Sequence, residues 1–211
     1  GNGDATIDST PLDYPVHFKV SATTNQWARL WRGAFVFDTS SIPDDNTINS
    51  ATFSFYGNGK FDVNSNTPDI NVYSFSPAST TALTNSDYQT VTGTAFSTTI
   101  TYADYSTTAY NDFALNANGL AEISVTSHSN FTLRNANHDV SNSAPSWSST
   151  AQSGLEGNFA EQTGTTKDPK LVVTYSGADS CTYTSGDWYI TASDNCVISS
   201  DVDVGGNSVI V

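Results

Sequence analysis

The sequence contains no methionine, only three histidines, and only seven lysines and arginines against 21 aspartates and glutamates, which gives a net charge of −14 at pH 7. Nucleic acids bind proteins through clustered cations, so a nucleic-acid partner is not expected. The negative charge also disfavours an anionic membrane surface. No apolar run reaches the roughly 18 residues that a spanning helix needs, so we expect no membrane insertion.

Cysteine is equally scarce, with only Cys181 and Cys196 present. Neither lies in a C-x-x-C motif or close to a histidine, which argues against zinc. In an oxidising compartment the pair would close a short loop and contribute about 3 kcal/mol. Two free thiols in a cytosolic protein are the alternative. We expect a disulfide and an extracellular or cell-surface location; the absence of a visible signal peptide would then indicate a mature or excised chain.

Helical periodicity is also absent, whereas short alternating apolar runs recur between Asn, Asp, Gly, Pro and Ser. Nine such runs are predicted to be strands: 16–20, 27–38, 48–56, 70–75, 95–101, 112–114, 121–125, 131–135 and 171–175. Many short strands separated by turn signals favour an all-β fold, an antiparallel β-sandwich or jelly roll. The chain of 211 residues is long enough to bury a sizeable core.

The segment Ser176-Gly177-Ala178 predicts a boundary between a β-sandwich domain, residues 1–177, and a small disulfide-containing β appendage, residues 178–211. Three further strands are predicted there, at 188–191, 196–199 and 208–211. Their spacing of about ten residues resembles the start of a right-handed parallel β-helix. The last of them is apolar and has no partner visible in the sequence, so it must pair within the chain or with a neighbour.

Five short motifs occur in the order expected for one family. They are RGAFVFDTSSIP at 32–43 with INSATFSFY at 48–56, then FTLR at 131–134, FAE at 159–161 and PKLVVTY at 169–175. In these motifs the chain resembles the DNRLRE-type secreted β-sandwich family over residues of about 4–176. Because some members are carbohydrate-binding modules, the resemblance implies a sandwich fold and a binding role. The stretch 4–20 matches poorly.

Aromatic residues among small polar ones are candidates for sugar binding, since sugar rings stack on flat aromatic surfaces and amides or carboxylates bind their hydroxyl groups. Trp31 is interpreted as a core residue, with sugar stacking as the alternative. The predicted ligand-binding residues are Trp147, Tyr102, Tyr105, Tyr110, Asn137 and Asp139.

Asp62, Asn64, Asn66 and Asp69 place oxygen ligands at intervals along one loop, as a chain does when it wraps a hard cation. An EF-hand is excluded because its glycine and its final glutamate are missing. The alternatives are an irregular loop with structural calcium and an ordinary polar turn. No cofactor is expected to be required.

The sequence shows no recognisable catalytic motif. Its only glutamates are Glu122, Glu156 and Glu161, and no G-x-S-x-G, H-E-x-x-H or P-loop motif occurs. We therefore predict that the protein is not an enzyme. The leading hypothesis is an extracellular module that binds a polysaccharide or surface glycan, or mediates surface attachment. The alternative is a structural subunit of a filament or tandem-repeat stalk, in which copies assemble head to tail by donating the C-terminal strand.

Overall fold

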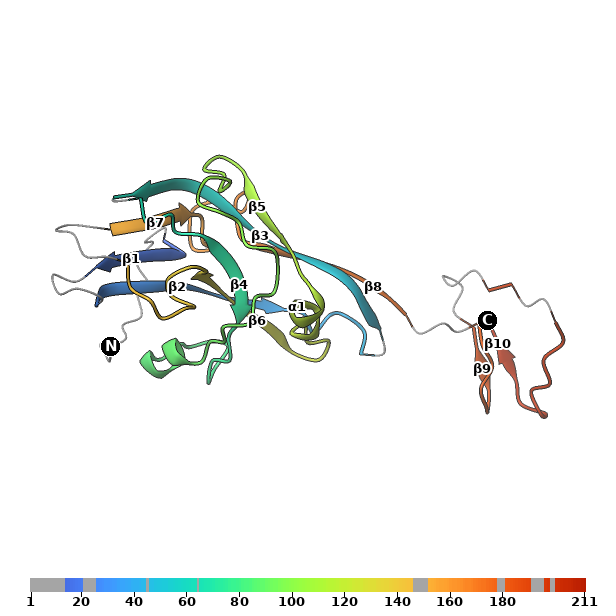
Figure 1. Cartoon of the computed structure of the whole chain (residues 1–211). Helices are drawn as coiled ribbons and strands as arrows, with labels where there is room; N and C mark the ends of the chain where they lie inside the picture. Colours follow the sequence, from blue (N-terminus) through green and yellow to red (C-terminus); the bar gives the residue numbers. More distant parts are fainter. Residues whose placement is uncertain are drawn as a thin grey trace.

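The computed structural model describes residues 14–20, 26–44, 46–63, 65–145, 152–177, 181–190, 196–197 and 200–211 (Figure 1). The elements are β1 (Val16–Val20), β2 (Trp27–Asp38), β3 (Thr47–Asp62), β4 (Ile70–Ser74), the 3-10 helix η1 (Asn85–Gln89), β5 (Tyr110–Ala114), α1 (Ala117–Ala121), β6 (His128–Asn135), β7 (Gln152–Gly157), β8 (Lys170–Ser176), β9 (Trp188–Tyr189) and β10 (Val209–Ile210). The predicted all-β class is confirmed. Within these described residues no helix is long and apolar enough to cross a membrane.

Two long strands, β2 and β3, change partners halfway along their length and so curl one antiparallel sheet around the core. Residues 27–32 of β2 pair with β1, whereas residues 33–38 pair with β6, which in turn pairs with β4. Residues 47–56 of β3 lie between β8 and β5, whereas residues 57–62 pair with β7. Since β1 also pairs with β7, the strands β2-β1-β7-β3 form a bridging layer between two wings, β2-β6-β4 and β5-β3-β8 (Figure 1).

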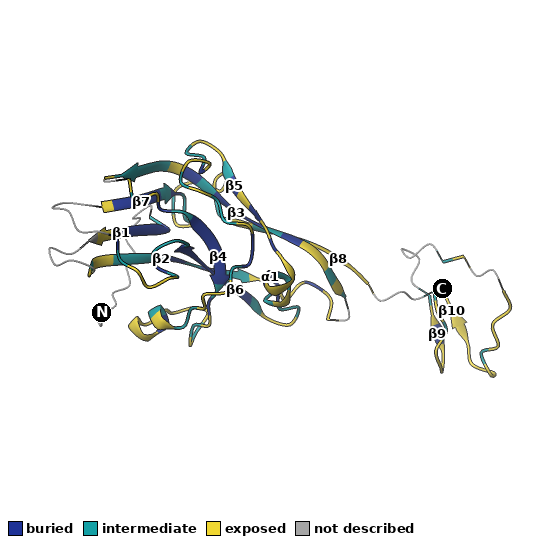
Figure 2. Ribbon diagram, viewed as in Figure 1, coloured by how far each residue is buried: buried dark blue, intermediate teal, exposed yellow. Residues whose placement is uncertain are grey.

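The core lies between the two wings and is dominated by phenylalanine. The ring of Phe53 on β3 contacts those of Phe35 on β2 and Phe131 on β6, at centroid distances of 5.0 and 6.1 Å. Val16 and Leu155 extend this cluster beneath one face of the bridging layer. Figure 2 shows the buried residues gathered along these strands. Alternation of apolar residues along β2 and β3 directs their phenylalanines into this cluster.

Most of the nine strands predicted between residues 16 and 175 are confirmed, with three errors among them, and β7 was not predicted. The prediction ended β3 at Tyr56, but the strand continues six residues further through a bulge between Gly57 and Gly59. The predicted strand at 121–125 is wrong, because the helix α1 ends there, with its N-terminus capped by the Asn116 side chain. The predicted strand at 95–101 is reduced to a single bridge between Ile70 and Ile100.

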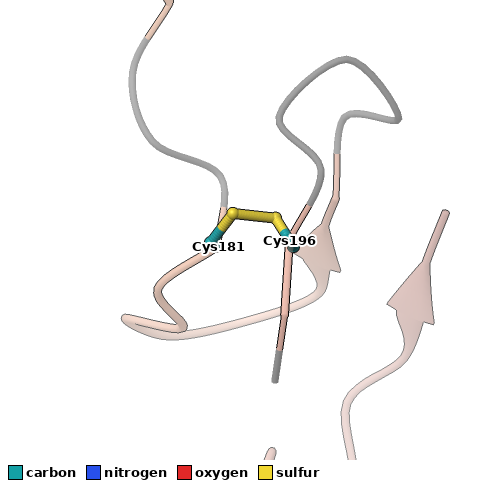
Figure 3. The surroundings of a disulfide bond; sticks show 2 residues. All are labelled: Cys181 and Cys196. Carbon is teal, nitrogen blue, oxygen red and sulfur yellow. A yellow bond between two sulfur atoms is a disulfide. The ribbon is translucent and has the colours of Figure 1, made fainter. Parts of the chain in front are cut away.

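The described C-terminal residues form a second, two-stranded sheet in which β9 and β10 are parallel, with Trp188 opposite Val209. The strand that lacked a visible partner is therefore paired with another part of the same chain. The predicted disulfide is present and joins Cys181 to Cys196 (Figure 3). This segment leaves large apolar side chains exposed, including Tyr189 and Val211 at 65% and 89%.

Candidate binding site

The three predicted ligand-binding tyrosines are buried or partly buried. Tyr105 is only 2% exposed and donates its hydroxyl hydrogen to the Glu156 carbonyl at 2.8 Å, so its ring belongs to the core and cannot present a face to a sugar. Burial raises the pKa of this phenol. Trp147 lies outside the described residues.

Tyr102 and Tyr110 are partly buried, and each already has a lysine over its ring. Lys60 lies 4.9 Å from the Tyr102 centroid and donates to the Tyr102 carbonyl, and Lys170 lies 3.9 Å from the Tyr110 centroid. The Tyr110 hydroxyl also donates to the carbonyl of Asp168. Both tyrosines therefore fasten loops to strands in this structure.

Asp139, a predicted ligand-binding residue, is buried between two arginines, so its carboxylate is engaged within the protein. Its two carboxylate oxygens accept hydrogen bonds from Arg32 on β2, at 2.6 and 2.8 Å, and from Arg134 on β6, at 2.8 and 2.9 Å. Burial alone raises the pKa of Asp139, but the hydrogen bonds and charges of the two arginines outweigh it and hold that pKa below its usual value. We call Arg32, Arg134 and Asp139 the arginine clamp.

Asn137 is likewise used internally. Its amide oxygen accepts from the Asn135 side chain at 2.8 Å and from the Asp69 N–H at 3.3 Å, and its amide nitrogen donates to the Thr67 carbonyl at 2.7 Å. These contacts join the loop after β3 to the loop after β6. Asn137 therefore orders the two loops and has little hydrogen-bonding capacity left for a ligand.

The proposed cation loop is closed by its own hydrogen bonds. Asp62 accepts from the N–H groups of Asn66 and Thr67 and from the Ser153 hydroxyl, and Asp69 accepts from the Tyr102 N–H. Asn64 lies outside the described residues. In the described part of the chain no group of three acidic, histidine or cysteine side chains is arranged to hold a metal ion. Structural calcium stays a prediction, which chelation followed by thermal unfolding would check.

A different set of aromatic residues does converge, on the bridging layer. The strand register places Trp31 of β2 opposite His17 of β1, His17 opposite Gly154 of β7, and Gly154 opposite Phe61 of β3. Residues directly opposite each other in antiparallel strands project from the same face of a sheet. The row therefore crosses all four strands on the face opposite Val16 and Leu155.

Ring contacts hold the row together. His17 lies 4.3 Å from Trp31 and 5.4 Å from Phe61, both edge to face, and Tyr14, just before β1, contacts all three at 5.1 to 5.8 Å. The missing side chain of Gly154 leaves room for Phe61, because a Cβ there would lie 2.8 Å from the Phe61 ring. We call Tyr14, His17, Trp31 and Phe61 the aromatic row. Tyr14, Trp31 and Phe61 remain partly exposed.

His17 at the centre of the row is 6% exposed, and neither ring nitrogen has a hydrogen-bond partner. Burial, together with the positive charges of Arg29 and Lys19, lowers the pKa of His17 to about 4, so the ring is neutral at neutral pH. Gln152 is near enough to oppose this fall, although no hydrogen bond of acceptable geometry joins it to the ring. A buried polar group without a partner destabilises a protein by about 1–3 kcal/mol.

Lys19 and Arg29 lie directly opposite each other in the β1–β2 register, two residues from His17 and Trp31 and on the same face. The other five cations are engaged elsewhere: Arg32 and Arg134 bind Asp139, Lys60 binds loop carbonyls, and Lys167 and Lys170 lie over tyrosine rings. Both Lys19 and Arg29 are exposed, and within the described residues neither has an ion pair, hydrogen bond or ring contact. Like charges directly opposite each other are unfavourable in a sheet.

The aromatic row and the neighbouring cation pair thus combine flat rings, a neutral imidazole, an amide and two positive charges on one sheet face. Such a face can stack on the C–H side of a ring and attract an anionic group. Among known proteins no family model, no curated protein and no solved structure matches the chain. The resemblance to the DNRLRE-type family therefore stays a prediction.

Proposed function

We propose that this protein is a non-catalytic extracellular module that binds an acidic polysaccharide on the bridging layer, through the aromatic row and the Lys19–Arg29 pair. The observation that carries the proposal is the juxtaposition of partly exposed rings with two unpartnered cations at adjacent positions of one sheet face. Sugar rings stack on aromatic rings through their C–H faces. The binding surface therefore differs from the loops that the sequence suggested.

The charge of the ligand follows from the cation pair. A molecule with a net charge of −14 repels polyanions at long range, so an acidic saccharide would bind only where positive charge is locally concentrated. Arginine suits carboxylate and sulfate groups because its planar fork binds two oxygens at once. The disulfide between Cys181 and Cys196 supports an oxidising, extracellular setting.

The test is affinity electrophoresis, followed by calorimetry, on four probes: polygalacturonate, its fully methyl-esterified neutral form, dextran sulfate and neutral dextran. We expect the wild-type chain to bind one or both acidic probes and neither neutral one. Binding of polygalacturonate alone would identify a uronate ligand, and binding of dextran sulfate alone a sulfated one. Equal binding to neutral and acidic probes would contradict the assignment of charge, and failure to bind any probe would overturn the proposal.

Matched variants locate the site. Trp31→Ala should reduce affinity at least about tenfold, as expected when a stacking ring is lost, whereas Tyr175→Ala, an exposed ring on β8, should not. Lys19→Gln combined with Arg29→Gln should abolish the preference for acidic probes. The control is Lys167→Gln with Lys170→Gln, which removes the same charge from the outer face of the β5-β3-β8 wing.

A second candidate function, a subunit of an extracellular filament or stalk, is favoured by the C-terminal segment. Val209, Ile210 and Val211 are 50%, 40% and 89% exposed, and β10 pairs with β9 on one side only among the described residues. A strand from another copy would have to add to the other edge of β10. Negative-stain electron microscopy tests this: ordered fibres lost on Ile210→Asp support it, and dispersed particles at high concentration contradict it.

A further inference from the structure

We propose that His17 binds the ligand directly, with one ring nitrogen accepting a hydrogen bond from a saccharide hydroxyl and the other donating to a saccharide oxygen. This inference rests on the proposed function and adds a specific contact between the ligand and a buried residue of that site. Among the described residues three buried side-chain polar atoms have no partner, the amide oxygen of Asn130 and the two ring nitrogens of His17, and His17 is the one residue whose polar atoms are all unpaired.

Within the described residues neither ring nitrogen of His17 has a hydrogen bond of acceptable geometry, although the Gln152 side chain lies near enough to raise the pKa of the ring. Trp31, Phe61 and Tyr14 contact it through their rings, and the residue opposite it on β7 is Gly154, which has no side chain. A buried polar group in a native protein nearly always has a partner, and exceptions often belong to binding or catalytic sites. Packing alone does not explain the imidazole, because a phenylalanine would fill a similar volume without two unpaired polar atoms.

The positive neighbours add a reason for the neutral form. Arg29 and Lys19 lie on the same face as His17, and with burial they oppose its protonation. A neutral imidazole has one donor and one acceptor, which matches the hydroxyl group, itself both a donor and an acceptor. A charged imidazole would have two donors and no acceptor. The site therefore offers one hydrogen-bond donor and one acceptor, which together suit a hydroxyl group, beside two cations that attract an acidic group.

His17 is 6% exposed, so a ligand reaches its ring nitrogens only when a neighbouring ring of the aromatic row moves aside. Trp31 and Phe61 lie within strands β2 and β3, and Tyr14 lies just before β1. Loss of the His17 side chain should weaken affinity.

The deciding variant is His17→Phe, which keeps an aromatic ring in the row. We expect its thermal midpoint to equal or exceed that of the wild type, and its affinity for the acidic probe bound by the wild type to fall about tenfold, the loss expected for two neutral hydrogen bonds. A lower midpoint would overturn the inference, because it would show that the imidazole stabilises the fold. Unchanged affinity with intact folding would overturn it as well.

A second measurement reads the contact directly. In ¹⁵N-edited spectra the His17 ring nitrogens, assigned by their absence in His17→Phe, should shift on saturation with the acidic probe, while those of His128 and His138 should not. If Trp31→Ala loses binding but the His17 nitrogens do not move, the inference fails and the proposed function stands. If the wild type binds no probe, the proposed function fails, and with it the role given to His17.

Discussion

The arginine clamp and the aromatic row both contain buried polar side chains, but only the clamp gives them hydrogen-bond partners within the protein. In the clamp, Asp139 and the two arginines form four mutual hydrogen bonds, and the arginines donate further to the carbonyls of Tyr88 and Thr92. In the aromatic row, His17 is equally buried and has no hydrogen bond. The clamp has the contacts of a structural element, whereas the row lacks those contacts.

This difference separates residues that hold the fold from residues at the surface on which we propose binding. Buried charges persist in proteins when they are paired and hydrogen-bonded, and the clamp meets that condition while fastening the loop after β6 to the wing. The row does not meet it, although a fully apolar residue could occupy the position of His17. The unsatisfied group therefore marks the surface on which we expect binding.

The largest expected effect comes from the clamp. Asp139→Asn removes the shared negative charge and leaves Arg32 and Arg134 uncompensated, so we expect the free energy of unfolding to fall by about 3–5 kcal/mol, measured by urea denaturation at pH 7. The control is Asp112→Asn, an exposed carboxylate that accepts a hydrogen bond from Ser54. A loss as small as that of the control would show that the clamp is not structural.

The clamp also predicts an acid transition. Because the pKa of Asp139 is held below its unfolded value, its contribution is complete above about pH 4 and disappears as the pH falls through the lower, folded-state pKa. The wild type should therefore lose more stability than Asp139→Asn when the pH is lowered from 5 to 2. Parallel pH profiles for the two chains would contradict this.

A smaller effect is expected in the aromatic row. Gly154→Ala would place a Cβ 2.8 Å from the Phe61 ring, so the ring must move, at about 1–3 kcal/mol. Its effect on binding should be larger than its effect on folding, since displacement of Phe61 disturbs the row. Urea denaturation and calorimetry with the acidic probe measure the two effects. A variant that binds normally would show that Phe61 is not part of the binding surface.

The strands of the wings could be predicted from the sequence because their alternation is clear. The segment 27–38 reads as one strand and is one strand, β2. The end of β3 could not be predicted, since GNGKFD reads as a turn and becomes a strand only because β7 pairs with it across a bulge. β7 itself, QSGLEG, lacks an alternating pattern and was missed. Tertiary pairing decides both segments.

The candidate site was missed for a related reason. The alternation in 16–20 places His17 and Lys19 on one face, but only the register of four strands shows that Trp31, Gly154 and Phe61 share that face. The predicted ligand residues came from polar loops, where Asp139 and Asn137 proved to be bound internally. The disulfide was predictable, because two cysteines in a chain with no metal motif leave few alternatives.

The smallest effect concerns pH and sharpens the contrast between the two regions. The pKa of His17 is lowered to about 4 in the folded chain, below the ordinary value near 6.5, so the unfolded chain binds its proton first. Above about pH 6.5 the ring is neutral in both states and does not make the free energy of unfolding depend on pH. As the pH falls from 6.5 toward 4, the unfolded chain binds the proton and the free energy of unfolding declines. Allowing for partial screening by solvent, we expect the wild type to lose about 1–2 kcal/mol more than His17→Phe between pH 7 and pH 4.5. Urea denaturation of both chains at the two pH values measures this difference. If the difference is absent, His17 is open to water in the free protein, and its unpaired nitrogens no longer distinguish the aromatic row from an ordinary surface.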